Sequence, residues 1–158
     1  MKTLQTTVLM LALAITIGCA VPHGPRCQAI TVEPLPPMYW GRGDYAFYSS
    51  PLDESPTLNS VFCLDPKGGA VVKVNGRVIP LTFKQRREHN KIAKHDSVGD
   101  RVVEVWQSAD TSVTLNYRIT FVCPPGDEAC EVTRYEGTMQ VQIGTSKCSY
   151  HVWGHLGV

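Results

Sequence analysis

The sequence has almost no net charge, with 15 Lys and Arg against 14 Asp and Glu in 158 residues. Removing the first 18 residues takes away only Lys2 among these, which leaves the remainder neutral. A neutral chain has no bulk field that attracts polyanions, so nucleic acid is excluded as an expected partner. The apolar content of 43% argues against disorder, and the length fits one domain.

Motifs for catalysis and for metals are also missing. The chain has no nucleophile elbow, no His-Glu-x-x-His, no Gly-x-Gly-x-x-Gly and no phosphate-binding loop. No closely spaced cysteine pair suits zinc, and His151 and His155 on a predicted strand would be about 13 Å apart, too far for one ion. We therefore predict a non-catalytic protein with no cofactor and no metal site.

Cysteine, proline and glycine, in contrast, are plentiful. Six Cys, eleven Pro and thirteen Gly in so short a chain are typical of a turn-rich β protein from an oxidising compartment.

The N-terminus is typical of an export signal. Lys2 precedes the apolar run from Val8 to Ile17, which is too short to cross a bilayer, so residues 1–18 are predicted to be a signal peptide. The sequence Thr16-Ile17-Gly18-Cys19 resembles the lipobox of bacterial lipoproteins. The resemblance implies that Cys19 is acylated and becomes the new N-terminus, and Ala20 implies delivery to the outer membrane of a Gram-negative cell. The alternative is ordinary cleavage after Ala20, giving a soluble periplasmic or secreted protein.

Residues 19–58 are rich in proline. Seven of the eleven prolines lie between residues 21 and 56, and proline disfavours both helices and inner strands, so we predict an extended tether or N-terminal arm. The aromatic side chains of this segment either pack on the domain, which we favour, or form an exposed recognition stripe. These side chains are Tyr39, Trp40, Tyr45, Phe47 and Tyr48.

Residues 59–158 are predicted to form one antiparallel β domain. Asn75-Gly76 between Ala70–Val74 and Val78–Phe83 indicates a hairpin with a type I′ turn. Alternating apolar and polar residues indicate strands with one buried face, which suits a small sandwich or barrel. The further expected strands are Val102–Gln107, Ser112–Cys123, Val132–Arg134, Thr138–Ile143 and Ser149–Trp153.

The segment Lys84–Arg101 has no apolar stripe, and we expect a long mobile loop there. Its excess of basic residues suggests a site for an anionic envelope polymer such as lipopolysaccharide or peptidoglycan. The alternative, which we favour, is a solvated loop kept soluble by its charge. The candidate anion-binding residues are Lys84, Arg86, Arg87, Lys91 and Lys94.

Five cysteines follow Cys19. Cys123 and Cys130 flank a turn-forming segment and are predicted to face each other across a hairpin mouth. We pair Cys63 with Cys148, which leaves Cys27 for an intermolecular bond or a free thiol, although four cysteines allow three connectivities.

The order of elements in the domain resembles that of membrane-bound C-type lysozyme inhibitors. The resemblance is carried by Val61-Phe62-Cys63, Val74-Asn75-Gly76 through Leu81, Val105-Trp106-Gln107-Ser108-Ala109-Asp110, Val113-Thr114-Leu115 and Cys123. It implies a small lipid-anchored β-barrel with a disulfide. We therefore expect an envelope lipoprotein whose tethered domain binds an envelope protein or polymer, with a lysozyme inhibitor and a small cell-wall hydrolase as alternatives. The sequence does not specify an oligomeric state.

Overall fold

The protein is an antiparallel β-barrel. A computed structural model describes residues 27, 30–39, 45–51, 59–65, 68–89, 96–127 and 129–157, so the predicted signal peptide and Cys19 lie outside the described residues. The elements are β1 (Val32–Glu33), the 3₁₀ helix η1 (Pro37–Tyr39), β2 (Tyr45–Tyr48), β3 (Ser60–Leu64), β4 (Ala70–Val74), β5 (Arg77–His89), β6 (Arg101–Gln107), β7 (Thr111–Phe121), β8 (Val132–Ile143) and β9 (Ser146–Gly157).

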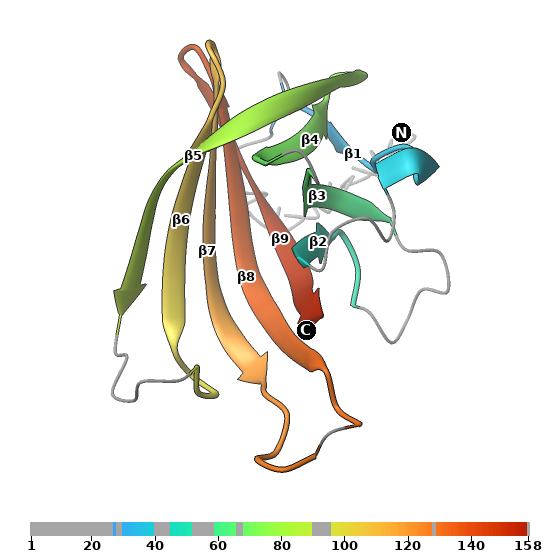
Figure 1. Ribbon diagram of the computed structural model, residues 1–158. Coiled ribbons are helices and arrows are strands. Elements are labelled where there is room, and N and C mark those ends of the chain that lie inside the picture. The colour runs from blue at the N-terminus through green and yellow to red at the C-terminus, as the bar shows by residue number, and fades with distance from the viewer. Residues whose placement is uncertain are drawn as a thin grey trace, which may run out of the picture.

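Eight strands close on themselves in the order β4-β3-β2-β9-β8-β7-β6-β5, and β1 pairs with Lys73 and Val74 of β4, beyond the residues that pair with β3. Closure comes from β5, whose first half pairs with β4 while its second half pairs with β6 (Figure 1). The predicted all-β fold is confirmed, and of the two architectures expected it is the barrel.

The predicted hairpin at Asn75-Gly76 is present. Both residues have positive φ, 49° and 77°, as a type I′ turn requires. This turn joins β4 to β5 at the same end of the barrel as the β6–β7 and β8–β9 hairpins, whose tips point to the top of Figure 1. We call this end the hairpin end. The last residues of β5 and β7 lie at the opposite end, at the bottom of Figure 1, which we call the open end.

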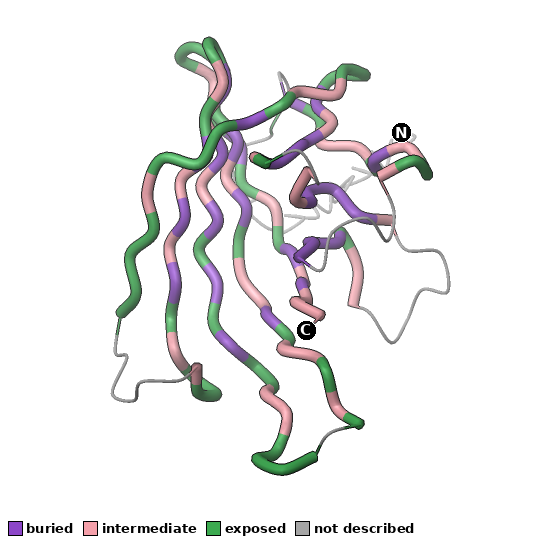
Figure 2. The backbone as a smooth tube through the Cα atoms, in the orientation of Figure 1, coloured by how far each residue is buried: buried purple, intermediate pink, exposed green. Residues whose placement is uncertain are grey.

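The core fills the barrel interior. Along β7, the inward Val113, Leu115, Tyr117 and Ile119 are buried and alternate with more exposed residues, and Figure 2 shows the same alternation in β6. This is the period-two pattern expected from the sequence.

A second apolar cluster lies outside the barrel. Leu35, from the chain before η1, packs with outward side chains of β2, β3 and β4, and Tyr39 of η1 packs against the same cluster. The aromatic arm therefore packs on the domain, as the favoured alternative expected, while Trp40 lies outside the described residues. The other members of this outer cluster are Ala46, Tyr48, Cys63, Val71 and Val78.

The prediction that the proline-rich region contains no inner strand is wrong for β2. Tyr45–Tyr48 contains no proline and pairs with β3 on one side and β9 on the other. All four residues are buried, so this short segment between prolines is part of the barrel wall.

The expected loop at Lys84–Arg101 is also wrong in its first part. β5 continues to His89, and its partner across residues 82–89 is β6, with a bulge between Phe83 and Gln85. Pairing with an apolar neighbour sets the backbone here, although most side chains of this half are exposed. Residues 90–95 lie outside the described residues.

The disulfide prediction is half right. Cys123 pairs with Cys130 as expected, with their Cα atoms 5.5 Å apart. Cys148, however, pairs with Cys27, and Cys63 is a buried free cysteine. The reason is geometric: Cys148 faces the interior core from β9, whereas Cys63 on β3 faces the outer cluster, and β2 lies between the two strands.

The Cys27–Cys148 disulfide helps to close the hairpin end. After Cys27 the chain places Ile30 in the interior core, and the Tyr150 hydroxyl donates to the Ile30 carbonyl at 2.6 Å. The next residue, Thr31, donates its N–H to Asn75 Oδ1 at 2.7 Å. This N-terminal segment thus reaches from β9 to the β4–β5 turn.

Among the described residues, no helix is long and apolar enough to span a lipid bilayer.

Candidate functional site

The open end of the barrel contains a cavity of about 290 Å³. At this end it is lined by Tyr45, the first residue of β2, and by Leu156 near the end of β9, and Leu64 ends β3. From there the lining continues along β5 and β6 as far as Phe83 and Trp106, which pair with each other. Asp96 reaches it from the connection between β5 and β6. The full lining is Tyr45, Leu64, Phe83, Arg86, Asp96, Glu104, Trp106, Tyr135 and Leu156.

Glu104, a lining residue of this cavity, is a buried carboxylate on β6. It is only 4% exposed and occupies an inward position between Val102 and Trp106. Burying a carboxylate is costly unless donors surround it. Glu104 Oε2 accepts from the Tyr45 hydroxyl at 3.0 Å and from Trp106 Nε1 at 3.2 Å, while Oε1 accepts from the Tyr117 hydroxyl at 3.1 Å. Both carboxylate oxygens are therefore held in place.

Arg86 supplies the positive charge next to this carboxylate. Its guanidinium lies 3.5 Å from Glu104 Oε1 and 3.0 Å from Glu88 Oε1. Desolvation alone would lower the pKa of Arg86, but electrostatic interactions with Tyr117, Glu104 and Glu88 raise it above its ordinary value. Arg86 is therefore a permanent cation shared between two carboxylates.

The tyrosines around Glu104 remain protonated donors. Burial is the main cause that raises the pKa of Tyr45 and Tyr117, and the negative charge of Glu104 adds to it. Burial also raises the pKa of Tyr135 to about 12, with a further contribution from the charge of Asp96. Neutral hydroxyls suit hydrogen bonding to a carboxylate and give the cavity wall no further negative charge.

Aromatic rings form much of the cavity wall. Tyr45 meets Tyr135 edge to face at 5.8 Å, and Phe83 meets Trp106 in the same way at 5.0 Å between ring centroids. Phe83 is 46% exposed, so a large apolar ring in the cavity wall is open to solvent. The site therefore combines apolar walls with a few fixed polar groups, as small-molecule sites do.

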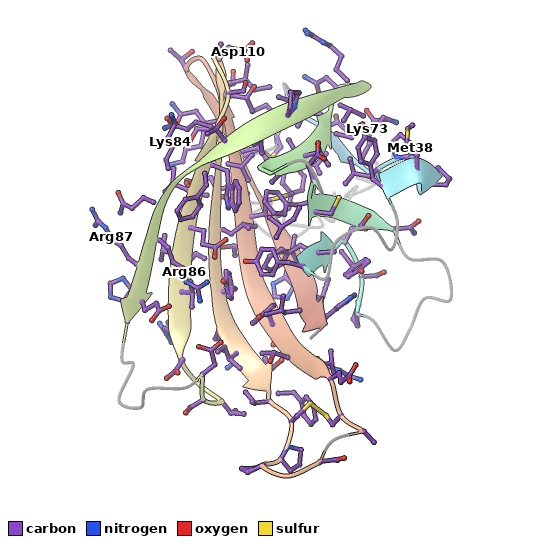
Figure 3. All side chains as sticks on the ribbon, in the orientation of Figure 1. Met38, Lys73, Lys84, Arg86, Arg87 and Asp110 are labelled. Atoms are coloured by element: carbon purple, nitrogen blue, oxygen red, sulfur yellow. A yellow bond between two sulfur atoms is a disulfide. The ribbon has the colours of Figure 1, made fainter. Side chains whose placement is uncertain are left out.

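Of the three predicted anion-binding residues that the structure describes, Lys84, Arg86 and Arg87, Arg86 alone lines the cavity. Arg86 lines the cavity, but Figure 3 shows Arg86 and Arg87 on opposite sides of β5. Lys84 does not line the cavity, and Lys91 and Lys94 lie outside the described residues. Arg86 is thus a candidate for binding an anion in the cavity, but its guanidinium is already paired with the carboxylates of Glu88 and Glu104.

The two C-terminal histidines have separate partners. His151 lies 3.3 Å from Glu136, and the His155 ring stacks on Tyr48 with centroids 5.4 Å apart. Within the described ranges, no group of three or more His, Cys, Asp or Glu residues is placed to hold a metal ion.

Sequence reasoning missed the Glu104 cluster. A signal for it was present: Glu104 is in phase with Val102 and Trp106 in an alternating strand, so the pattern directs a carboxylate into the core. The donors come from Tyr45, Trp106 and Tyr117, and their convergence depends on β2 joining the barrel.

Two further hollows lie outside this cavity. One, of about 310 Å³, lies over β6, β7, β8 and β9, and in it Glu136 pairs with Arg118 and lies 3.3 Å from His151. The other, of about 450 Å³, lies at the hairpin end around residues 107–112. Neither combines a buried charge with aromatic walls as the open-end cavity does. No protein-family model, curated protein or solved structure matches the chain.

Proposed function

We propose that the protein is a non-catalytic binding protein of the bacterial cell envelope that takes a small ligand, or the end of a larger one, in the open-end cavity. The observation that carries the proposal is the position of a fully partnered buried carboxylate beside aromatic walls at one end of a closed barrel. Barrels of eight strands have room inside for side chains or for one small ligand.

Binding rather than catalysis is supported by the state of Glu104. A general acid or base must exchange a proton with substrate, whereas both oxygens of Glu104 accept from Tyr45, Trp106 and Tyr117. The hydrolase alternative would predict turnover of purified peptidoglycan, and we expect none.

The envelope location is supported by the two disulfides, because these bonds persist in oxidising compartments. Attachment to the outer membrane through acylated Cys19 remains part of the proposal. The mass of the mature protein extracted from membranes should exceed the peptide mass by a diacylglyceryl and an acyl group. A free N-terminus at Val21 would contradict lipid attachment and leave a soluble exported protein.

The test of the binding site is a fragment screen followed by amide chemical shifts. We expect small aromatic compounds to shift the amides of Arg86, Asp96 and Tyr135 more than those of the β6–β7 and β8–β9 turns. Phe83→Ala should weaken this binding because it removes the exposed ring of the cavity wall. Phe121→Ala is the matched control, since Phe121 is 38% exposed, lies beneath Arg134 and does not line the cavity. Equal effects of the two variants would contradict the site.

A lysozyme inhibitor is the second candidate, and it is favoured by one observation. The small closed barrel with disulfides is the fold that the resemblance to membrane-bound C-type lysozyme inhibitors implies. Protection of cells or purified peptidoglycan from C-type lysozyme would support it, and unchanged lysis at saturating protein would exclude it.

A further inference from the structure

We propose that the outer wall of the barrel carries a second binding site, which takes a short stretch of polysaccharide in the hollow over β6, β7, β8 and β9. This site is separate from the open-end cavity and goes beyond the function proposed above. It is carried by a row of polar side chains that crosses the wall and ends at a partly exposed tryptophan.

The strand register sets out this row. Arg101 of β6 lies opposite Arg118 of β7. Arg118 in turn lies opposite Glu136 of β8, which lies opposite Trp153 of β9. All four alternate along their strands with inward residues, so their side chains share the outer face. Neighbouring strands are about 4.8 Å apart, so the row is about 14 Å long and accommodates more than one sugar ring.

The hollow deepens the wall beside this row. Its volume is about 310 Å³, and its floor comes from the buried Tyr117 and from Gly137, which lie opposite each other in β7 and β8. A Cβ at Gly137 would collide with the Asn116 carbonyl oxygen, so glycine lets the two strands approach closely. The surrounding polar side chains therefore form walls around a depression rather than part of a flat surface.

Several polar groups of the site are free to bind a ligand. The side chains of Arg101 and Asn116 and the indole N–H of Trp153 make no hydrogen bond or ion pair with other residues in the described part of the chain. Arg118 and Glu136 pair with each other at 3.0 Å, which places donors directly beside an acceptor. Sugar hydroxyls both donate and accept, so a saccharide matches such a mixed set of groups.

The aromatic end of the row favours a sugar ring. Trp153 contacts the His151 ring edge to face, with centroids 4.4 Å apart, and His151 lines the hollow. A pyranose ring has an apolar C–H face and a polar rim, while an indole has an apolar face and one donor. One ring of the saccharide therefore packs against Trp153. The next ring lies over the hollow, with its hydroxyls toward Asn116 and the Arg118–Glu136 pair.

A neutral probe tests the ligand class: the linear trisaccharide of β-1,4-linked N-acetylglucosamine. When it is titrated into the full mature chain, it should shift the indole N–H signal of Trp153 and the backbone amides of Asn116 and His151. The indole N–H of Trp106 is the internal control, because it donates to Glu104 inside the barrel and should not move.

Three substitutions locate the site. Trp153→Ala should weaken binding of the trisaccharide about tenfold, because it removes the ring that the sugar packs against. Asn116→Ala should weaken binding several-fold and changes only an exposed side chain, so it decides the matter if Trp153→Ala does not fold. Gln142→Ala is the matched control, since it removes an exposed amide from the same outer face at the hairpin end and should leave binding unchanged.

Inorganic phosphate separates a sugar site from an anion site. If phosphate shifts the same signals at lower concentration than the trisaccharide does, the site binds anions at Arg101 and Arg118 and the saccharide is overturned. Equal trisaccharide binding by the wild type and Asn116→Ala would also overturn it, as would the absence of any shift up to about 10 mM. Shifts confined to Asp96 and Tyr135 would place the sugar in the open-end cavity, which overturns the outer site and leaves the proposed binding function standing.

Discussion

The two ends of the barrel differ in how they are held. The hairpin end has three tight turns, the Cys27–Cys148 disulfide and Ile30 in the core. The open end has the longer connections and a cavity, and its buried centre is the carboxylate of Glu104. The comparison teaches that the disulfide between distant parts of the chain lies at one end, while the other end, where Cys123–Cys130 closes only a short loop, retains a polar, partly open interior suited to binding.

The largest effect should come from the disulfide at the hairpin end. Cys27–Cys148 spans 121 residues, and in the chain-entropy account its loss costs about 5 kcal/mol of unfolding free energy. Cys123–Cys130 spans only 7 residues at the open end, and its loss should cost about 2.5 kcal/mol. Urea unfolding of the two double Cys→Ala variants measures both.

That pair of variants also tests the contrast between the ends. Ligand binding in the open-end cavity should survive loss of Cys27–Cys148 at temperatures where the variant is folded. Similar unfolding free energies for the two variants would mean that the hairpin end is not specially stabilised by its disulfide.

The second effect concerns Glu104. Glu104→Ala leaves the Trp106 indole and the Tyr117 hydroxyl without their acceptor, whereas Arg86 keeps Glu88 and the Tyr45 hydroxyl keeps that of Tyr117, and the change should cost about 3–5 kcal/mol. Glu104→Gln keeps one acceptor oxygen and should cost less. Urea unfolding monitored by circular dichroism gives both values. A loss below about 1 kcal/mol for the alanine variant would show that the cluster does not stabilise the open end.

The third effect is alkaline destabilisation of the outer cluster. Burial, with a smaller contribution from Asp65, raises the pKa of the Cys63 thiol from 9.0 to about 11. The unfolded chain therefore loses this proton first, so the thiol's contribution to stability is intact below pH 9.0 and is lost as the pH rises to about 11. Tyr48, whose pKa burial raises to about 12, acts in the same direction at higher pH.

Cys63→Ala isolates the thiol. Unfolding free energy measured across this alkaline range should fall less steeply for the variant than for the wild type, while the Tyr48 contribution stays in both. Parallel curves would show that Cys63 does not remain protonated in the folded state.

Much of the wall could be predicted from sequence because its signals are local. Asn75-Gly76 specifies its own turn, the alternation from Val113 to Ile119 specifies one buried face, and Cys123 and Cys130 are close along the chain. None of these needs information from a distant part of the sequence.

What could not be predicted depends on contacts between distant segments. The insertion of β2 between β3 and β9 separates Cys63 from Cys148 and brings Tyr45 to Glu104, a residue 59 positions later. The extension of β5 depends on its pairing with β6, since its own residues lack an apolar stripe. The candidate site is assembled by these same contacts, so the alternation along β6 could have indicated the inward Glu104, but not the donors around it.

The smallest effect contrasts Glu104 with a glutamate on the outside of the barrel. Glu136 pairs across strands with Arg118 at 3.0 Å and lies 3.3 Å from His151, but its side chain is 32% exposed. Exposed pairs contribute about 0.2–1 kcal/mol, so Glu136→Gln should change unfolding free energy by no more than this in urea. The hydrogen bond from Arg118 lowers the pKa of Glu136, so its contribution is present above its ordinary value of 4.5 and is lost as the pH falls through the lowered value. A loss of unfolding free energy as large as that for Glu104→Ala would contradict the contrast. The exposed carboxylate would then contribute as much as the buried one, although water screens its charge.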